Sequence, residues 1–211
     1  MKLIYLILFL FISTSNCCEQ IFTVKNLNVT EYIRKEWYIQ KQQVTPYLPK
    51  NENYCVKAKY TLSNKKVPFF NGEVLNVYNY ANIDKVNGNN ANKNNNTLCA
   101  RIPNSNLQSK LLVGPCFLPN LLAGDYWIIA VGPNSNNYQW AIIIGGQPTE
   151  SYRDGCTTKT NSINNSGLWI FTRDQNPSKT IINFLLRMIN SKGISTLLLN
   201  DVVQLGCTYS S

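Results

Sequence analysis

The pattern of hydrophobic and polar positions is clearest between Gly124 and Asp174, where three apolar runs follow one another. Each run has about the length of a β-strand, is rich in Ile, Val and aromatic residues, and is bounded by Gly, Pro or Asn. The runs are too short for buried helices, and the turns between them predict an antiparallel meander. They are Gly124–Val131, Tyr138–Ile144 and Leu168–Arg173.

The first of these runs is apolar on both faces, so we expect something to cover each face. Alternation places Tyr126, Ile128 and Ala130 on one face and Trp127, Ile129 and Val131 on the other. A closed barrel with an apolar interior and a helix outside would cover both.

Upstream, Tyr54–Leu62 alternates cleanly, with lysines and a threonine on one face and apolar side chains on the other, and predicts a strand with one wet face. Further strands are expected at Lys35–Gln40, Gly72–Asn79, Thr97–Ile102 and Lys110–Val113. The segment Val86–Asn96 is almost all Asn and Gly and predicts a flexible loop without packing contacts, and Cys18–Thr30 predicts an irregular arm.

A helix is expected after the last strand. Asn176 is the expected N-cap, Pro177 the first helical residue, and Gly193 ends the helix. The helix carries an apolar stripe that predicts packing against the outside of a sheet. The tally is about eight strands and one helix without βαβ alternation. The fold class expected is therefore all-β, an eight-stranded antiparallel up-and-down barrel with one C-terminal α-helix packed outside.

The chain has 211 residues, 44% of them hydrophobic, which is enough for one sizeable domain. Lys2, the apolar run Leu3–Ile12 and small residues at Ser13 and Ser15 are typical of a secretory signal. Cleavage after Ser15 and after Cys17 both fit. We take residues 1–17 as the signal peptide and 18–211 as a single domain, and expect a secreted protein without stable membrane insertion.

Seven cysteines and no histidine in a secreted chain predict disulfides rather than a metal site, and no cofactor is expected. The net charge of +9 comes from basic residues scattered along the sequence, which indicates solvated surface rather than a nucleic-acid partner. Glycosylation sequons begin at Asn28, Asn95 and Asn164 and predict surface loops.

Several of these segments together resemble the lipocalin family. Lys35-Glu36-Trp37-Tyr38 is similar to the family's first motif, and the three central runs resemble its closing strands. The second and third strands look most like the branch that holds apolipoprotein D, bacterial lipocalin and the plant temperature-induced lipocalins. The chain departs from the family at Lys35, where the motif has glycine, and at the turn before Tyr138, which lacks the Thr-Asp-Tyr sequence of a receptor-facing signature.

The resemblance implies roles for several residues. Trp37 would close the barrel floor and Arg173 would lie across its ring as a cation–π contact. Cys55 would pair with Cys207, and Cys156 with Cys18 or Cys17. This leaves Cys99 and Cys116, which flank the fourth and fifth strands, to pair with each other.

The function expected is that of a carrier that holds one small hydrophobic molecule, such as a lipid, retinoid, sterol or pigment, in the barrel. Tyr60 and Tyr126 could each offer a hydroxyl to a ligand's polar end. Alternation and the resemblance together give the expected lining, each member of which could equally be plain core: Ala58, Tyr60, Leu75, Val77, Tyr126, Ile128, Ala141, Ile143, Trp169 and Phe171.

Two alternatives stay open. Some lipocalins are enzymes that act on lipids, among them a prostaglandin isomerase. That isomerase needs a free thiol that faces the cavity. The cysteine pairing given above leaves no such thiol. Without histidine there is also no Ser-His or Cys-His pair, so no catalytic residue is predicted and we expect no enzyme. The other alternative is a defensive or adhesive barrel with no ligand cavity.

Overall fold

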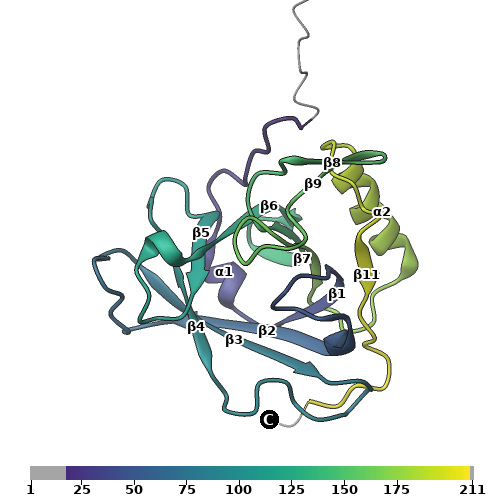
Figure 1. Cartoon of the computed structure of the whole chain (residues 1–211), viewed down its shortest axis with the longest axis horizontal. Helices are drawn as coiled ribbons and strands as arrows, with labels where there is room; N and C mark the ends of the chain where they lie inside the picture. Colours follow the sequence, from purple (N-terminus) through teal and green to yellow (C-terminus); the bar gives the residue numbers. More distant parts are fainter. Residues whose placement is uncertain (1–17, 210–211) are drawn as a thin grey trace, which may run out of the picture.

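The computed structural model describes residues 18–209, so the expected signal peptide and Cys17 lie outside the described residues. Eight antiparallel strands follow one another round a barrel, which closes because the last strand pairs with the first (Figure 1). The strands are β1 (Trp37–Gln43), β2 (Tyr54–Leu62), β3 (Val74–Asn82), β4 (Thr97–Arg101), β5 (Lys110–Gly114), β6 (Gly124–Asn134), β7 (Asn137–Ile144) and β10 (Leu168–Thr172).

All eight expected strands are present, and β2 has the bounds that its alternation predicts. A ninth strand, β11 (Leu199–Asp201), lies antiparallel to the end of β1, and β8 (Glu150–Tyr152) with β9 (Gly155–Thr157) form a separate hairpin. These three segments are only three residues long. Runs of that length carry too little alternation to be recognised in the sequence.

A β-bulge in β6 overturns part of the expected alternation. Ile128 pairs with Ile143, but Ala130, two residues further on, pairs with the adjacent Ile142. The extra residue, Ile129, shifts the side-chain parity. Val131 therefore packs against the inner core, and Ala130 against the outer one, the reverse of the expectation.

The helix α2 (Lys179–Asn190) packs outside the barrel, as expected, and Figure 1 shows it beside the barrel wall. Its N-cap is Ser178 rather than Asn176, because the Ser178 hydroxyl accepts from the Ile181 backbone N–H. Ser178 is still extended (φ −62°, ψ 149°), so the helix begins only at Lys179 and Pro177 lies before it. The expected apolar stripe comprises Ile181, Leu185, Met188 and Ile189, and of these Leu185 and Ile189 are buried completely.

A short helix, α1 (Val29–Ile33), lies in the arm that we expected to be irregular. The Asn28 side chain accepts from the Glu31 backbone N–H and caps it. The helix contacts β2 and β7, at the end of the barrel where β1 begins and β6 turns into β7. We call this the closed end. The open end is the opposite one, which carries the β1–β2, β3–β4 and β5–β6 loops.

Two apolar cores lie on opposite sides of the barrel wall. The inner core fills the barrel from Trp37 and Tyr32 to Ile128 and Ile143. The outer core joins α2 to the outward faces of β6, β7 and β10. Both faces of these three strands are thus covered along their central parts, which explains why the sequences there are apolar on both faces.

The structure contains all three expected disulfides, which are Cys18–Cys156, Cys55–Cys207 and Cys99–Cys116. The Asn-rich segment does make packing contacts, contrary to expectation. Asn87 donates to the Gly206 carbonyl at 3.0 Å and Asn92 to the Asn79 carbonyl at 3.0 Å. Amide side chains can bond local and distant backbone, so an Asn-rich loop can be well tied down.

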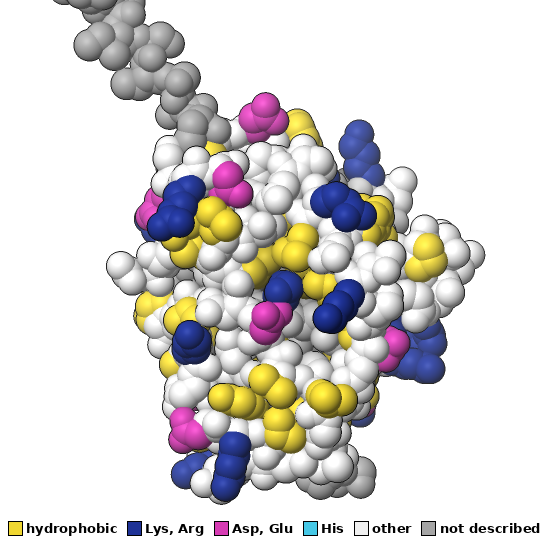
Figure 2. Space-filling view, turned by 90° about the vertical axis from the view of Figure 1, so that its right-hand side faces the viewer, with side chains coloured by type: hydrophobic (Ala, Val, Ile, Leu, Met, Phe, Trp, Pro, Cys, Tyr) yellow, Lys and Arg dark blue, Asp and Glu magenta, His cyan; other side chains and the backbone are white. Residues whose placement is uncertain are grey.

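Among residues 18–209, no helix is long and apolar enough to cross a membrane. Basic side chains are spread over the surface that carries α2 rather than gathered in one patch (Figure 2).

Candidate ligand-binding site

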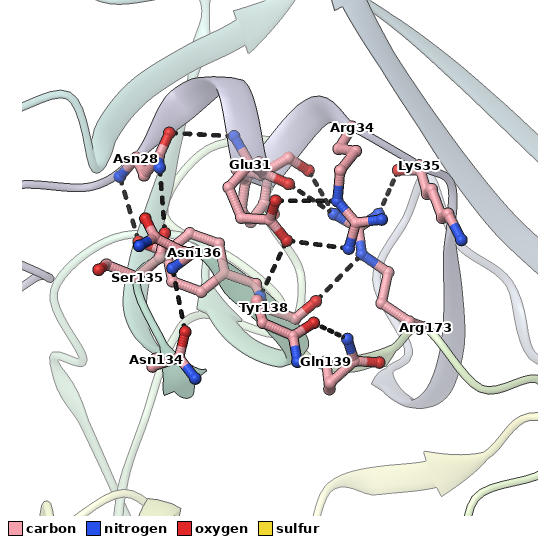
Figure 3. Close-up of polar contacts among 12 residues, drawn as sticks. Asn28, Glu31, Arg34, Lys35, Asn134, Ser135, Asn136, Tyr138, Gln139 and Arg173 are labelled. Atoms are coloured by element: carbon pink, nitrogen blue, oxygen red, sulfur yellow. Dashed lines mark hydrogen bonds and ion pairs between the residues drawn. The ribbon is translucent and has the colours of Figure 1, made fainter.

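The closed end is sealed around Trp37, whose side chain is fully buried. The Arg173 guanidinium lies over the indole, 3.5 Å from the ring centroid, as the resemblance implies. Burial lowers the pKa of Arg173 to about 10, so the group still carries its charge at neutral pH. Its N–H groups donate to the backbone carbonyls of Glu31, Tyr32, Lys35, Glu36 and Tyr138 (Figure 3).

Glu31 links α1 to the strands at this end. Its carboxylate accepts from the Arg34 guanidinium at 2.8 and 3.0 Å and from the Tyr138 backbone N–H at 3.0 Å (Figure 3). The hydrogen bonds from Arg34, opposed by burial, lower the pKa of this carboxyl. The closed end is thus held together by satisfied polar contacts around the buried Trp37.

The structure brings the ten expected lining residues together in the inner core. Nine of them are less than 9% exposed, including Trp169 at 8% and Ile143 at 0%. These nine pack against one another and form the walls of the barrel. Tyr126 is the member of the set that is partly exposed.

Ala81 on β3 and Val131 on β6 face the inner core and stay partly exposed. So do Leu98 on β4, Val113 on β5 and Tyr126 on β6. The last three lie on three neighbouring strands, and Leu48 in the β1–β2 loop is partly exposed as well. Leu48, Leu98 and Val113 were absent from the expected lining. The alternation of β4 and β5 could have supplied the latter two, but those strands are short and were the weakest in the sequence.

A chain of three tyrosine hydroxyls crosses the interior. The Tyr126 hydroxyl lies 2.8 Å from that of Tyr32 on α1 and 2.7 Å from that of Tyr60 on β2. Burial raises the pKa of all three well above that of an exposed tyrosine, so they stay protonated. Trp169 stacks on Tyr126, with ring centroids 6.4 Å apart. Sequence reasoning found Tyr60 and Tyr126 but missed Tyr32, because α1 was not expected.

The β5–β6 loop, residues 115–123, stands beside the partly exposed strands at the open end. Three of its apolar side chains are mostly exposed, Phe117 at 75%, Leu121 at 90% and Leu122 at 55%. The fully buried Arg101 holds this loop, because its guanidinium donates to four backbone carbonyls, including those of Pro115 and Leu118 at 2.8 Å. The Cys99–Cys116 disulfide anchors the same loop.

No cluster of three or more Cys, Asp or Glu side chains in residues 18–209 could hold a metal ion. All six cysteines of this range are in disulfides.

The expected glycosylation sites differ in their setting. Asn95 and Asn164 are exposed in loops, whereas Asn28 is partly buried and uses its amide to cap α1 and to donate to the Ser135 carbonyl (Figure 3). Glycosylation of all three stays a prediction.

No family model and no curated protein matches the sequence. The fold is similar to solved structures of apocrustacyanin C2 (TM-score 0.53, 15% identity, 85% of this chain and 81% of that one) and lobster apocrustacyanin A1 (0.52, 16%, 84% and 79%). The allergen Per a 4 from cockroaches is also similar (TM-score 0.52, 14% identity, 89% of this chain and 95% of that one). At these identities the likeness concerns the fold alone, and the branch expected from the sequence stays a prediction. All three proteins are lipocalins, and this chain has the lipocalin fold.

Proposed function

We propose that this protein is a secreted carrier that binds one small hydrophobic molecule inside the barrel, through the open end. The observation that carries the proposal is the contrast between the partly exposed, inward-facing Leu98, Val113 and Tyr126 and the sealed floor around Trp37. Apolar side chains that face inward and still meet solvent are stabilised by a ligand that removes them from water, by about 25 cal/mol per Å² of apolar surface.

The proposed site is narrower than the ten residues expected from the sequence. A ligand would contact Tyr126 and Trp169 first, with Leu98 and Val113 at its sides. The other expected contacts, from Ala58 to Phe171, support the walls around it. Secretion is supported by the three disulfides, which are typical of oxidising compartments.

Titration with the fluorescent apolar dye N-phenyl-1-naphthylamine tests this proposal. In Val113→Trp the larger side chain would cover the partly exposed inward-facing residues beside it, so we expect the affinity to fall at least about tenfold, a free-energy change of about 1.4 kcal/mol. Val203→Trp is the matched control, because Val203 is 41% exposed on the tail. Equal dye binding by both variants would place the dye elsewhere and contradict the proposal.

The second candidate is a barrel that functions without a ligand, as a defensive or adhesive protein. It is favoured by the near-complete burial of nine of the ten expected lining residues. This candidate predicts no saturable dye uptake by the wild-type protein. An enzymatic function has no comparable support, since no thiol in residues 18–209 is outside a disulfide.

A further inference from the structure

A strained and exposed phenylalanine marks the β2–β3 loop, residues 63–73. The Phe70 N–H donates to the Val67 carbonyl at 3.2 Å, which closes a four-residue turn with Pro68 second and Phe69 third. Phe69 has a positive φ of 58°, and the third position of such a turn favours Gly or Asn because other side chains are strained there. Phe69 is also 99% exposed, so no burial offsets the strain. A strained residue that contributes nothing to the core indicates a function.

The β2–β3 loop lies against the β5–β6 loop. It folds back over the outer face of β3 and β4, where Val67 and Phe70 pack with Cys99 and Cys116. Figure 1 shows the two loops on the same side of the barrel, at the left of that view in blue and teal. Phe117 follows Cys116 directly and is mostly exposed. Exposed apolar side chains from two separate loops therefore project from one side of the molecule.

Both loops are fixed in place by contacts beneath their exposed side chains. Val67 is buried and anchors the β2–β3 loop. The Cys99–Cys116 disulfide and the hydrogen bonds from Arg101 to the Pro115 and Leu118 carbonyls anchor the β5–β6 loop. A loop that is already ordered loses little conformational entropy when a partner covers its side chains, which favours binding.

The charges of the two loops fit an anionic lipid surface. Residues 63–72 carry Lys65 and Lys66, both exposed, and no acidic residue, and Glu73 follows just before β3. Residues 114–124 carry no charge at all. Lysines beside exposed aromatic and aliphatic side chains are typical of segments that bind the surface of anionic membranes.

A lipid surface fits these loops better than a second copy of the chain or another folded protein. Two copies joined here would bring the lysines of both loops together, which is unfavourable. An aromatic anchor in a protein interface is ringed by further contacts that exclude water. Phe69, at 99% exposure, has almost no surface of its own protein around it to form such a ring. A bilayer interface removes single side chains from water without requiring a matching surface.

We propose that the β2–β3 and β5–β6 loops together bind the surface of an anionic lipid bilayer. Phe69, Phe117 and Leu121 enter the interface between headgroups and acyl chains, and Lys65 and Lys66 contact the anionic headgroups. The binding is peripheral and reversible. The inference goes beyond the proposed carrier function and does not depend on it, because none of these five side chains belongs to the inner core.

Sedimentation with lipid vesicles tests the proposal. We expect the wild-type protein to bind phosphatidylcholine vesicles that contain about 30% phosphatidylserine, and to bind pure phosphatidylcholine vesicles more weakly. Phe69→Gly should lower the partition coefficient at least about tenfold, because a phenyl group no longer leaves water on binding. Leu205→Gly is the matched control, because Leu205 is 78% exposed on the C-terminal tail, and it should bind like the wild-type protein.

Thermal unfolding of Phe69→Gly separates binding from folding. Glycine adopts a positive φ without strain, so the variant should unfold at a temperature no lower than the wild-type protein. Weaker vesicle binding by a protein of undiminished stability is the result expected of a residue that serves binding. A lower unfolding temperature would give the phenyl ring a structural role and overturn the proposal.

A charge variant tests the headgroup contact. Lys66→Gln should weaken binding to the phosphatidylserine vesicles about fivefold and leave binding to pure phosphatidylcholine unchanged. Lys179→Gln is the matched control, because Lys179 is exposed at the start of α2, and it should change neither. Equal binding of the wild-type protein to both kinds of vesicle would contradict an anionic partner.

Amide hydrogen exchange of the wild-type protein needs no variant. The phosphatidylserine vesicles should slow exchange in residues 66–71 and 117–122 and leave α2 unchanged. Slower exchange in α2 instead, or no vesicle binding at all, would overturn the proposal. The carrier function would stand in either case, because dye binding is measured without lipid.

Discussion

The two ends of the barrel are each held by an arginine, but the arginines do opposite things for access to the interior. Arg173 bonds to five backbone carbonyls at the closed end and covers the fully buried Trp37. Arg101 bonds to four carbonyls near the open end and fixes a loop whose apolar side chains remain in solvent. Arg173 thus covers the buried tryptophan at the closed end, whereas Arg101 fixes a loop that leaves Phe117 and Leu121 exposed at the other end.

The two sites also differ in how completely the guanidinium is satisfied. The N–H groups of Arg173 all find carbonyls, and the indole adds a cation–π contact. The Arg101 Nε is buried without a hydrogen-bond partner, and burial lowers the pKa of Arg101. At the closed end the guanidinium is fully hydrogen-bonded and stabilises the fold. At the open end a buried Nε without a partner opposes the stabilisation that the loop gains from Arg101.

The largest effect is expected from Arg173→Met. The variant leaves five carbonyls without their donor and uncovers Trp37, so we expect the free energy of unfolding to fall by about 3–5 kcal/mol. Denaturant unfolding followed by tryptophan fluorescence measures it. Arg187→Met, on the exposed side of α2, is the matched control and should change stability by less than about 0.5 kcal/mol. A loss no larger than the control's would contradict the sealing role.

A smaller loss, about 1–3 kcal/mol, is expected from Arg101→Met. Four carbonyls lose their donor, but a buried cation with an unsatisfied Nε is removed at the same time, which offsets part of the loss. Amide hydrogen exchange should speed up in residues 115–118 and stay unchanged in α1. Faster exchange at α1 instead would show that Arg101 does not act at the open end.

Acid should weaken the closed end by about 1 kcal/mol through Glu31. Its pKa is lower in the folded protein than in the unfolded chain, mainly because of hydrogen bonds from Arg34, so its contribution is complete above the unfolded value of about 4.3. The contribution is lost as the pH falls below that value and through the folded pKa. It is modest because Arg34 is partly exposed.

Glu31→Gln isolates this contribution. The variant should be less stable than the wild-type protein at pH 7, and the difference should shrink as the pH is lowered towards 3. Unfolding measured by circular dichroism across this range gives the comparison. If the difference in stability between the two proteins did not depend on pH, the charge of Glu31 would not contribute to stability.

The smallest effect on stability is expected in the β5–β6 loop at the open end. Leu121→Ser removes a side chain that is 90% exposed, so stability should change by less than about 0.5 kcal/mol. Phe69→Ser is the matched control, because Phe69 is 99% exposed in the β2–β3 loop at the closed end. Thermal unfolding should not distinguish the two. A larger loss of stability in Leu121→Ser would mean that the exposed apolar side chains of the β5–β6 loop stabilise the fold.

The sequence was enough to predict strands with one face in water and one in the core. It was also enough to predict strands that are buried on both faces. Tyr54–Leu62 alternates because its lysines face water, and Ala141–Ile144 is apolar throughout because the outer core with α2 covers its outward face. The bulge at Ile129 left no trace in composition, because Ala130 and Val131 are both apolar and either can face inward. In a strand that is apolar on both faces, the pairing with the neighbouring strand decides which side chains face inward.

The arm before Trp37 shows a signal that was available but overlooked. Asn28 followed by Glu31 has the spacing of a helix N-terminus, with an N-cap and an acid three residues later. Because α1 was missed, Tyr32 was missed too, and with it the third member of the hydroxyl chain. Contacts between Tyr32 and Tyr126 span 94 residues and depend on the barrel closing, so alternation alone could not supply them.

Native mass spectrometry of the protein taken from its natural source, followed by organic extraction of the same sample, tests the central claim most directly. The account predicts one small apolar molecule per chain, recovered in the extract. A bare chain with an empty extract, together with no dye uptake by the purified protein, would contradict the claim and favour a barrel that holds no ligand.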